Sequence, residues 1–571
     1  MPHAQFRNYG SQPVSELVMF AISHFGGIIP RLADHMLAEY QATVAHDVKL
    51  RNGRLEAWRV PCQFGREPVA NAKMFWLYGC CMPSWTQIMD VATIGPDWGG
   101  YFMTDHCGTG LQYVAVDECC NETARAYGIA APYNAPFVNA SEECSRDADA
   151  RSYVYTCVDE HGAESAPSPA SNIIRVNDGT SVTISGLVAT DNAVEINIYR
   201  SASGFRQMDG KVQTPVTEFL YVDTIPAGQS SYTDEIRTLA LGSALETQYD
   251  RMPPRGMTGL ISIGDQVRLA AFIRNRIFFS EQFQPHNWPA KYDLTLDHNI
   301  VRMMVQDQRI FVTTDSVPYI IDVSNCDDTK CTPVSQLEFP LPDIGCVRPH
   351  GAIMTEHGMF YASPVGIILL QANGQWHIVT SKWFGRDEWA RLMPDTIRMA
   401  YWEGYLVFAT DMATFMLDLN GKPYGDMSDG ELCTLSIRPD DLLVSNTGKL
   451  LYLEDNKVWV WDGGDKYMSY IWESRHIVSD NKAYGNNEQA AMSLADSPLW
   501  WPTEIKMSGE ATVELYDSNF HKVFDRFLAD TKAHKIRRCG RHPWYKLTLT
   551  GSGNVYSISL GNSSFTAYRG Q

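Results

Sequence analysis

Apolar and polar residues alternate in a repeated arrangement across the second half of the chain. Each repeat consists of two apolar, strand-like runs joined by a short polar turn. The five stretches are Val267–Ser280, Ile300–Asp322, Gly351–Gln371, Thr396–Leu419 and Asp440–Asp462. Period-2 alternation that is bounded by turn residues predicts antiparallel β-hairpins.

The turns of these hairpins recur at an almost regular interval. They centre on Asn275, Gln308, Gly358, Gly404 and Gly448, which gives separations of 33, 50, 46 and 44 residues. A period in the forties with several short strands per repeat is typical of propeller blades. One such unit cannot cover its own hydrophobic faces, so neighbouring units must pack face to face around an axis. The pattern therefore predicts a scaffold in preference to an enzyme.

The rest of the chain also predicts strands, with only a few short helices, so the expected fold class is all-β. Tyr153, Tyr155 and Cys157 alternate with polar residues, and further strand-like runs follow at roughly ten-residue spacing, as in a small β-sandwich. We expect four domains. They are an N-terminal platform (1–140), a sandwich (145–245), a propeller region (257–470) and a C-terminal β-domain (471–571) that could pack back on the platform.

Composition narrows the functional classes. The chain has 571 residues, of which 44% are hydrophobic and 20% charged, with 15 Trp, 27 Tyr and 23 Phe. A chain of this length is too long for a single hydrophobic core. Its high content of aromatic residues argues against disorder. The formal net charge of −19 argues against clamping nucleic acid through its phosphates. It is compatible with solubility alone, or with a surface that nucleic acid slides past.

The N-terminus and the cysteines indicate the cellular compartment in which the protein folds. The apolar run Leu17–Ile22 is shorter than the ~20 residues that span a bilayer, and no export signal is visible. The 13 cysteines include the adjacent pairs Cys80–Cys81 and Cys119–Cys120, while the spacing of Cys326 and Cys331 lacks a second pair for zinc. We expect buried, small apolar cysteines in a protein folded in a reducing cytosol, and no membrane-spanning segment.

Catalytic motifs are absent from the sequence. It contains no phosphate-binding loop, no H-E-x-x-H, no paired C-x-x-C and no G-x-S-x-G elbow. Propellers can house glycosidases, but Asn373–Trp376 lacks the Ser and Asp of a sialidase hairpin. Glu356, Asp387, Glu388 and Glu403 could form an acid/base pair, although turn positions in solvent explain them better. We expect no enzyme and no catalytic, cofactor-binding or metal-binding residue.

Three further segments have a functional and a structural interpretation. Asp418–Glu431 is acidic and glycine-rich, yet it breaks the calcium-loop pattern, so a loop between blades is favoured. Trp459 and Trp461 share a strand face and favour packing between blades over a sugar platform. Lys532–His542 holds five Lys or Arg and no acid. A contact with a neighbouring subunit and an exposed strand pair explain it equally well, and nucleic acid less well.

Several segments, taken in order, resemble the tail nozzle (tubular, hub-like) proteins of short-tailed bacteriophages. The opening Gly26–Ala33 with Val44–Trp58 is similar to the start of that family's N-terminal platform, and Tyr127–Pro132 to its proline-rich exit. A second group resembles the fibronectin-type insert of such virion proteins: Tyr153–Tyr155, Gly162–Pro169, Ile198–Ser201 and Ser231–Asp234. A third resembles its blade motifs: Phe278–Ser280, Met359–Ser363 with Gly366, and Ile471–Ser474. The first blade spacing and the cysteine-rich stretch 80–120 depart from the family.

The resemblance implies a structural role in a virion. Members form a ring, usually a homohexamer, below the portal and adaptor proteins, hold the tail fibres, and conduct and gate the ejected genome. Viral DNA would pass through the lumen without sequence-specific binding, and the protein would be made and assembled in the host cytoplasm. Two alternatives stay open: a propeller enzyme or lectin that acts on host surface glycans, and a secreted or surface adhesion protein.

Overall fold

A computed structural model describes most of the chain and divides it into two compact units. The first unit comprises Met1–Gln87 with Ser335–Gln571, and the second comprises Ile88–Val334. The described residues are 17–562, apart from 66, 96–97, 106–107, 142–148, 203–206, 209–210, 213–217, 265–266, 325–329, 334–342, 420–429, 479–499 and 538–539. This division is coarser than the four predicted domains and does not test their boundaries.

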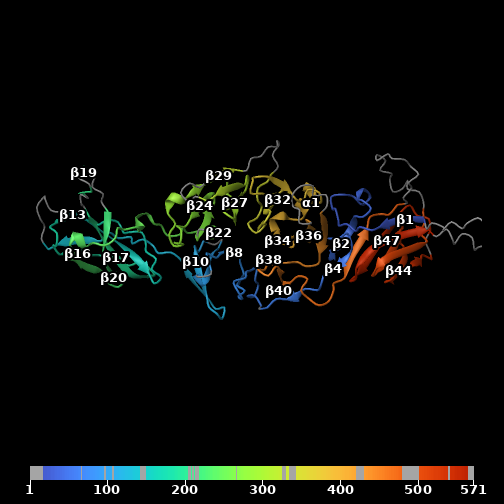
Figure 1. Ribbon diagram of the computed structural model, residues 1–571, viewed down its shortest axis with the longest axis horizontal. Coiled ribbons are helices and arrows are strands. Elements are labelled where there is room, and N and C mark those ends of the chain that lie inside the picture. Colours follow the sequence, from blue (N-terminus) through green and yellow to red (C-terminus); the bar gives the residue numbers. More distant parts are fainter. Residues whose placement is uncertain are drawn as a thin grey trace, which may run out of the picture. The chain divides into compact units, whose positions relative to one another are not determined.

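The second unit contains three four-stranded antiparallel sheets whose strands follow one another along the chain (Figure 1). The first sheet has β8 (Met89–Ala92), β9 (Gly100–Asp105), β10 (Gln112–Val116) and β11 (Glu122–Ala126). The second has β22 (Thr258–Ile263), β23 (Arg268–Ile273), β24 (Arg276–Phe279) and β25 (Leu294–Thr295). The third has β26 (Ile300–Gln306), β27 (Arg309–Thr314), β28 (Tyr319–Asp322) and β29 (Lys330–Pro333). The opening strands β8 and β26 both pack against β22, as the inner strands of propeller blades do.

A β-sandwich lies in the chain between the first two of these sheets. One face has β14 (Tyr153–Asp159), β17 (Ala193–Ala202) and β20 (Glu218–Pro226), and the other has β12 (Phe137–Ala140), β16 (Val182–Ser185) and β21 (Ser231–Asp234). The short pairs are β13 (Asp149–Arg151) with β15 (Ile174–Val176), and β18 (Gln207–Met208) with β19 (Lys211–Val212). Tyr153, Tyr155 and Cys157 point into a hydrophobic core of the sandwich's own, as predicted. The residues between them are buried as well, so the strand does not alternate between buried and exposed positions.

The first unit holds two more four-stranded sheets of this kind. One has β30 (Ala352–Thr355), β31 (Gly358–Ser363), β32 (Gly366–Leu370) and β33 (Trp376–Ile378). The other has β38 (Asp441–Val444), β39 (Leu450–Glu454) and β40 (Lys457–Val460), and its fourth strand is β5 (Cys62–Gln63) from the N-terminal segment. A distant part of the sequence therefore completes this sheet.

A nine-stranded sheet joins the two ends of the chain within the first unit. It begins with β34 (Arg398–Trp402), β35 (Tyr405–Ala409), β36 (Thr414–Asp418) and β37 (Glu431–Leu435). It continues through β2 (Ala42–His46), β41 (Tyr470–Ser474), β46 (Tyr545–Gly551), β43 (Ala511–Asp517) and β44 (Lys522–Leu528). A smaller sheet has the order β1 (Leu17–Ile22), β47 (Val555–Asn562), β42 (Glu504–Gly509) and β45 (Ala533–Lys535).

The remaining elements are short. The strand pairs are β3 (Val48–Lys49) with β4 (Glu56–Ala57), and β6 (Met74–Phe75) with β7 (Ser84–Trp85). The helices are α1 (Arg386–Arg391) and the 3-10 turns η1 (Asp34–Met36), η3 (Thr238–Ala240), η4 (Thr247–Tyr249), η6 (Ala290–Tyr292) and η7 (Pro394–Thr396). Within the described part of the chain, no helix is both long and apolar enough to cross a membrane.

The predicted all-β fold is confirmed, with propeller-type sheets, a sandwich inserted in the chain between two of them, and β-rich terminal segments. All five predicted hairpin turns separate two antiparallel strands where the pattern placed them. The turn between β34 and β35 uses two residues with positive φ, Glu403 at 48° and Gly404 at 84°. Such a tight turn needs a residue like glycine that tolerates this conformation.

Candidate functional site

The four carboxylates that could have formed an acid/base pair lie on three separate elements. Glu356 occupies the turn between β30 and β31 with 75% of its side chain exposed. Asp387 and Glu388 lie in the first turn of α1, and Glu403 occupies the turn between β34 and β35. These are the turn and helix-end positions that a structural interpretation expects.

The described ends of the acidic segment Asp418–Glu431 contact other parts of the first unit. Asp418 is buried and accepts hydrogen bonds from the guanidinium of Arg51, whose Nε lies 3.2 Å from the carboxylate. Arg51 also stacks 3.8 Å from the ring centroid of Tyr405. The carboxylate of Glu431 accepts a hydrogen bond from the backbone N–H of Gly27. Residues 420–429 lie outside the described part, so the proposed loop there stays a prediction.

The tryptophans of the last blade-type sheet belong to an aromatic cluster. Trp461, which follows β40, is 2% exposed and lies 5.9 Å from Trp58, measured between ring centroids. Trp58 lies equally far from Trp402, at the end of β34. Trp459 is partly buried against the same core. These contacts agree with packing between neighbouring sheets and do not form an exposed sugar platform.

Several residues of the basic segment Lys532–His542 contact other side chains of the chain. His534 Nε2 lies 2.7 Å from a carboxylate oxygen of Asp530, and His542 lies 3.4 Å from Asp517. Arg541 stacks 4.3 Å from the ring centroid of Trp501. A contact with another subunit remains a prediction, and Arg538 and Cys539 lie outside the described residues.

The cysteines depart in part from their predicted role. Cys157, Cys346 and Cys433 are buried, as expected of small apolar residues. Cys81 and Cys120, however, each take part in a disulfide bond. Adjacent cysteines are poor partners for each other, but the local pattern does not show whether either one pairs with a cysteine elsewhere in the sequence. Cys326 lies outside the described residues, so the expectation for that pair is untested.

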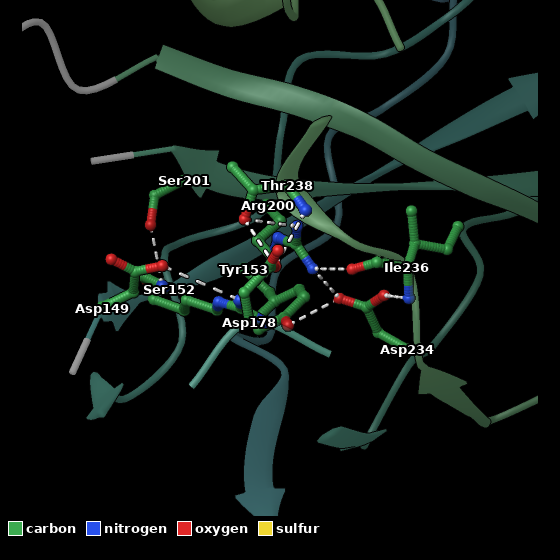
Figure 2. A network of polar contacts seen from close by, with 10 residues as sticks. Asp149, Ser152, Tyr153, Asp178, Arg200, Ser201, Asp234, Ile236 and Thr238 are labelled. Carbon is green, nitrogen blue, oxygen red and sulfur yellow. Dashed lines mark hydrogen bonds and ion pairs between the residues drawn. The ribbon is translucent and has the colours of Figure 1, made fainter. Parts of the chain in front are cut away.

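The densest buried polar network of the sandwich joins three strands to the segment that leaves the domain (Figure 2). Arg200 on β17 is 1% exposed and lies 2.7 Å from Asp234 on β21, which is fully buried. The hydroxyl of Tyr153 on β14 donates to the same carboxylate oxygen at 2.7 Å. Burial, followed by the charge of Asp234, raises the pKa of Tyr153, so the hydroxyl stays protonated and remains a donor.

The same network extends to the chain that follows β21. Arg200 donates to the backbone oxygen of Ile236 at 2.8 Å, and Asp178 accepts from the backbone N–H of Thr238 at 2.9 Å. Arg151, with 2% of its side chain exposed, lies 3.1 Å from Asp178. The hydrogen bond from the Thr238 backbone lowers the pKa of Asp178, so the carboxylate is ionised at neutral pH. These charged groups bind one another and the segment after β21. The arrangement therefore fixes that segment to the sandwich and offers no reactive group.

A second polar joint connects the opening strands of the three blade-type sheets in the second unit. Asp90 on β8 is fully buried and accepts a hydrogen bond from Gly259 N on β22 at 2.6 Å. It also forms an ion pair with Arg302 on β26, whose side chain is 18% exposed. One carboxylate therefore binds three sheets. A lone aspartate in the segment 87–92 gave no sequence signal for this role.

Similarity to known proteins is confined to solved structures. No protein-family model matches the chain, and no curated protein matches it. One similar structure is the extracellular domain of a protein described as a one-component system of B. thetaiotaomicron, with 9% identity, a TM-score of 0.27, and coverage of 70% of this chain and 47% of that chain. The chain thus spans about half the length of that domain.

Two further similar structures are bacterial proteins. PorZ, described as a surface component of the type-IX secretion system of Porphyromonas gingivalis, has 9% identity and a TM-score of 0.25, with 87% of this chain and 77% of that chain covered. A quinoprotein alcohol dehydrogenase-like protein from Bacteroides thetaiotaomicron has 9% identity and a TM-score of 0.22, with 62% and 92% covered. Likeness of this degree carries no argument about activity.

Proposed function

We propose that this chain is a structural subunit of a short-tailed phage tail, and that it assembles with copies of itself into a ring-shaped nozzle. The ring would lie below the portal and adaptor proteins, conduct the ejected genome and hold the tail fibres. The order of sequence motifs supports the family. The architecture of propeller-type sheets, sandwich and shared terminal sheet supports a scaffold.

One observation carries the non-enzymatic part of the proposal. Two charged pairs with a fully buried carboxylate, Arg200 with Asp234 and Arg302 with Asp90, both connect segments of backbone. Active sites instead direct perturbed titratable groups into a cleft where substrate can reach them. Buried charges that connect strands in this way would suit the wall of a nozzle, which must resist force.

The net charge suggests how DNA would pass. With 66 acidic and 47 basic residues, the chain carries a formal charge of −19. An acidic lumen would repel the phosphate backbone and keep a moving duplex from adhering. We hypothesise that the lumen of the ring is acidic. A map of charge on the assembled ring that shows a basic channel wall would refute this part.

The decisive test is electron microscopy of the particle that carries this chain. We expect several copies, six in the simplest case, in a ring at one vertex between the portal–adaptor complex and the fibres. Native mass spectrometry of the purified chain with its portal–adaptor complex should show the same stoichiometry. A free monomer that degrades bacterial surface polysaccharide would contradict the proposal and favour a glycan-acting enzyme.

A further inference from the structure

A polar pocket of about 460 Å³ opens on the first unit, at the ends of its C-terminal strands. Its lining includes Tyr467, Glu510, Asp530, Thr531, Asn554 and Tyr556. These residues come from the loop before β41, the β42–β43 turn, the end of β44, and the β46–β47 hairpin. None of them takes part in the polar joints described above.

Two exposed tyrosines give the pocket an aromatic surface. The side chain of Tyr467 is 57% exposed and that of Tyr556 is 45% exposed. Arg59 lies 5.8 Å from the ring centroid of Tyr467, and Arg54 lies 5.5 Å from that of Tyr556. Each guanidinium covers part of one ring by a cation–π contact, which holds the ring in place before any ligand arrives. The two rings line the same pocket, so a ligand in it could contact both of them.

The polar wall of the pocket is also fixed by the fold. His534 and the backbone N–H of Lys532 both donate to Oδ1 of Asp530, at 2.7 Å and 3.2 Å. The hydrogen bond from His534 lowers the pKa of Asp530, so this exposed carboxylate is ionised and its second oxygen can accept a further bond.

Close backbone packing places the second carboxylate. The backbone N–H of Glu510 donates to the carbonyl of Asn554 at 2.9 Å. The side chain of Glu510 lies directly over Gly553, where any Cβ would approach its Cγ to 2.1 Å. The absence of a side chain at position 553 therefore allows Glu510 to lie against the β46–β47 hairpin at the edge of the pocket.

The composition of the pocket defines the chemical class of its ligand. Two carboxylates, an amide and a threonine hydroxyl can accept or donate hydrogen bonds around two aromatic rings. Arg59 adds positive charge beside Tyr467, whereas Arg54 beside Tyr556 is paired with the carboxylate of Glu56 at 3.0 Å. A neutral molecule with many hydroxyl groups and an apolar face of C–H bonds matches these features. We propose that this pocket binds a saccharide, with the rings of Tyr467 and Tyr556 against the sugar and Glu510, Asp530 and Asn554 bonding its hydroxyls.

A cationic ligand is the main competitor, because aromatic rings beside carboxylates also bind quaternary ammonium groups. Arg59 opposes it most, since its positive charge already lies against Tyr467; Arg54 already covers part of the Tyr556 ring, although Glu56 pairs with its charge. The saccharide proposal does not depend on the nozzle proposal. A ring that does not bind sugar would refute the saccharide proposal and leave the nozzle proposal intact. A monomer that binds sugar would refute the nozzle proposal and leave the saccharide proposal intact.

The test uses saturation-transfer NMR on the full chain with three soluble probes: maltotriose, chitotriose and mannotriose. We expect at least one to bind with millimolar affinity, and Tyr467→Ala or Tyr556→Ala to weaken it by about tenfold, as loss of one aromatic contact implies. Tyr467→Phe keeps the ring and should keep most of the affinity. Tyr133→Ala is the matched control, because Tyr133 is 93% exposed and lies outside the pocket.

Three results would overturn the proposal. The first is no transfer to any of the three sugars at about 10 mM, a concentration at which even weak sites are partly filled. The second is binding that neither tyrosine variant weakens, while both variants melt at the wild-type temperature. The third is Tyr467-dependent binding of tetramethylammonium that is tighter than that of every sugar, which would identify a cation site.

Discussion

The blade-type sheets of the second unit and those of the first are closed by different means. In the second unit each four-stranded sheet comes from one continuous stretch, and a buried carboxylate, Asp90, binds the opening strands together. In the first unit the β38–β40 sheet takes its fourth strand from residues 62–63, and the β34–β37 sheet continues into β2. The three blade-type sheets of the second unit therefore share a buried charged joint, whereas two sheets of the first unit depend on bringing distant segments together.

This difference has consequences for folding and for assembly. Sheets made of consecutive strands need only short loops to close, so they can form early and locally. In the first unit, the β38–β40 sheet and the sheet that begins with β34 stay incomplete until the N-terminal segment arrives, and an incomplete sheet exposes an unpaired edge. The N-terminal segment thus acts as the closing element of the first unit.

The largest expected effect comes from removing the carboxylate of the second unit. Asp90→Ala leaves Arg302 without its partner at an 18% exposed position. Breaking a buried ion pair on one side costs about 3–5 kcal/mol. Hydrogen exchange should accelerate in β8, β22 and β26 and stay unchanged in β30 and β38.

Asp411→Ala is the control for this experiment. Arg398, its partner in the first unit, is also 18% exposed, but Asp411 itself is 54% exposed. Loss of such a surface pair costs at most about 1 kcal/mol. Equal loss of protection in the two variants would mean that Asp90 is not the joint that holds the three sheets.

A smaller effect is expected where the N-terminal segment contacts β37 within the first unit. A Cβ on Gly27 would lie 2.2 Å from the carbonyl oxygen of Leu432 on β37, so Gly27→Ala must displace one backbone from the other. Overpacking of this kind costs about 1–3 kcal/mol. We expect faster exchange in β2 and β37, while the second unit keeps its protection.

Gly228→Ala is the matched control, because nothing lies within 4 Å of a Cβ built at that position. Its effect should remain within about 0.5 kcal/mol, as for ordinary surface substitutions. Unchanged exchange in the Gly27 variant would show that the N-terminal segment does not tie down β37.

The sequence predicted the hairpins well because their signals are local. Period-2 alternation and turns such as Glu403–Gly404 depend on residues next to one another, and all five hairpins appear where expected. The alternation in Tyr153–Cys157 located the sandwich core for the same reason. Local patterns of this kind predict strands and turns even when the fold is not known.

Features that depend on distant pairing could not be predicted in this way. Strand β5 has only two residues, Cys62–Gln63, and is a strand only because β40 lies beside it. The sheet β8–β11 has the same strand order as the predicted repeats, but it precedes the sandwich and was assigned to the platform. The pair of Arg200 with Asp234 gave no signal either, since a charged residue on a strand normally faces solvent.

A further effect concerns pH, to which each unit responds through a different aspartate. Asp441 opens β38 and accepts a hydrogen bond from the backbone N–H of Phe75 at 3.1 Å. Burial raises its pKa from 3.8 to about 7, and hydrogen bonds from the Phe75 and Leu442 backbone, followed by Arg398 and Arg348, oppose the rise. In the second unit, burial raises the pKa of Asp250 to about 6.

The direction of the pH effect follows from proton binding. Between about pH 4 and pH 7 the folded first unit holds a proton at Asp441 that the unfolded chain releases, so stability is greatest at low pH and falls as pH rises through this window. Exchange at Phe75 and β38, corrected for the intrinsic rate, should therefore be slower at pH 5 than at pH 8. Asp441→Asn should flatten this response in the first unit and leave the response near Asp250 in place. Protection at Phe75 that instead increases with pH would show that Asp441 is ionised throughout, and that the N-terminal segment docks on a charged carboxylate.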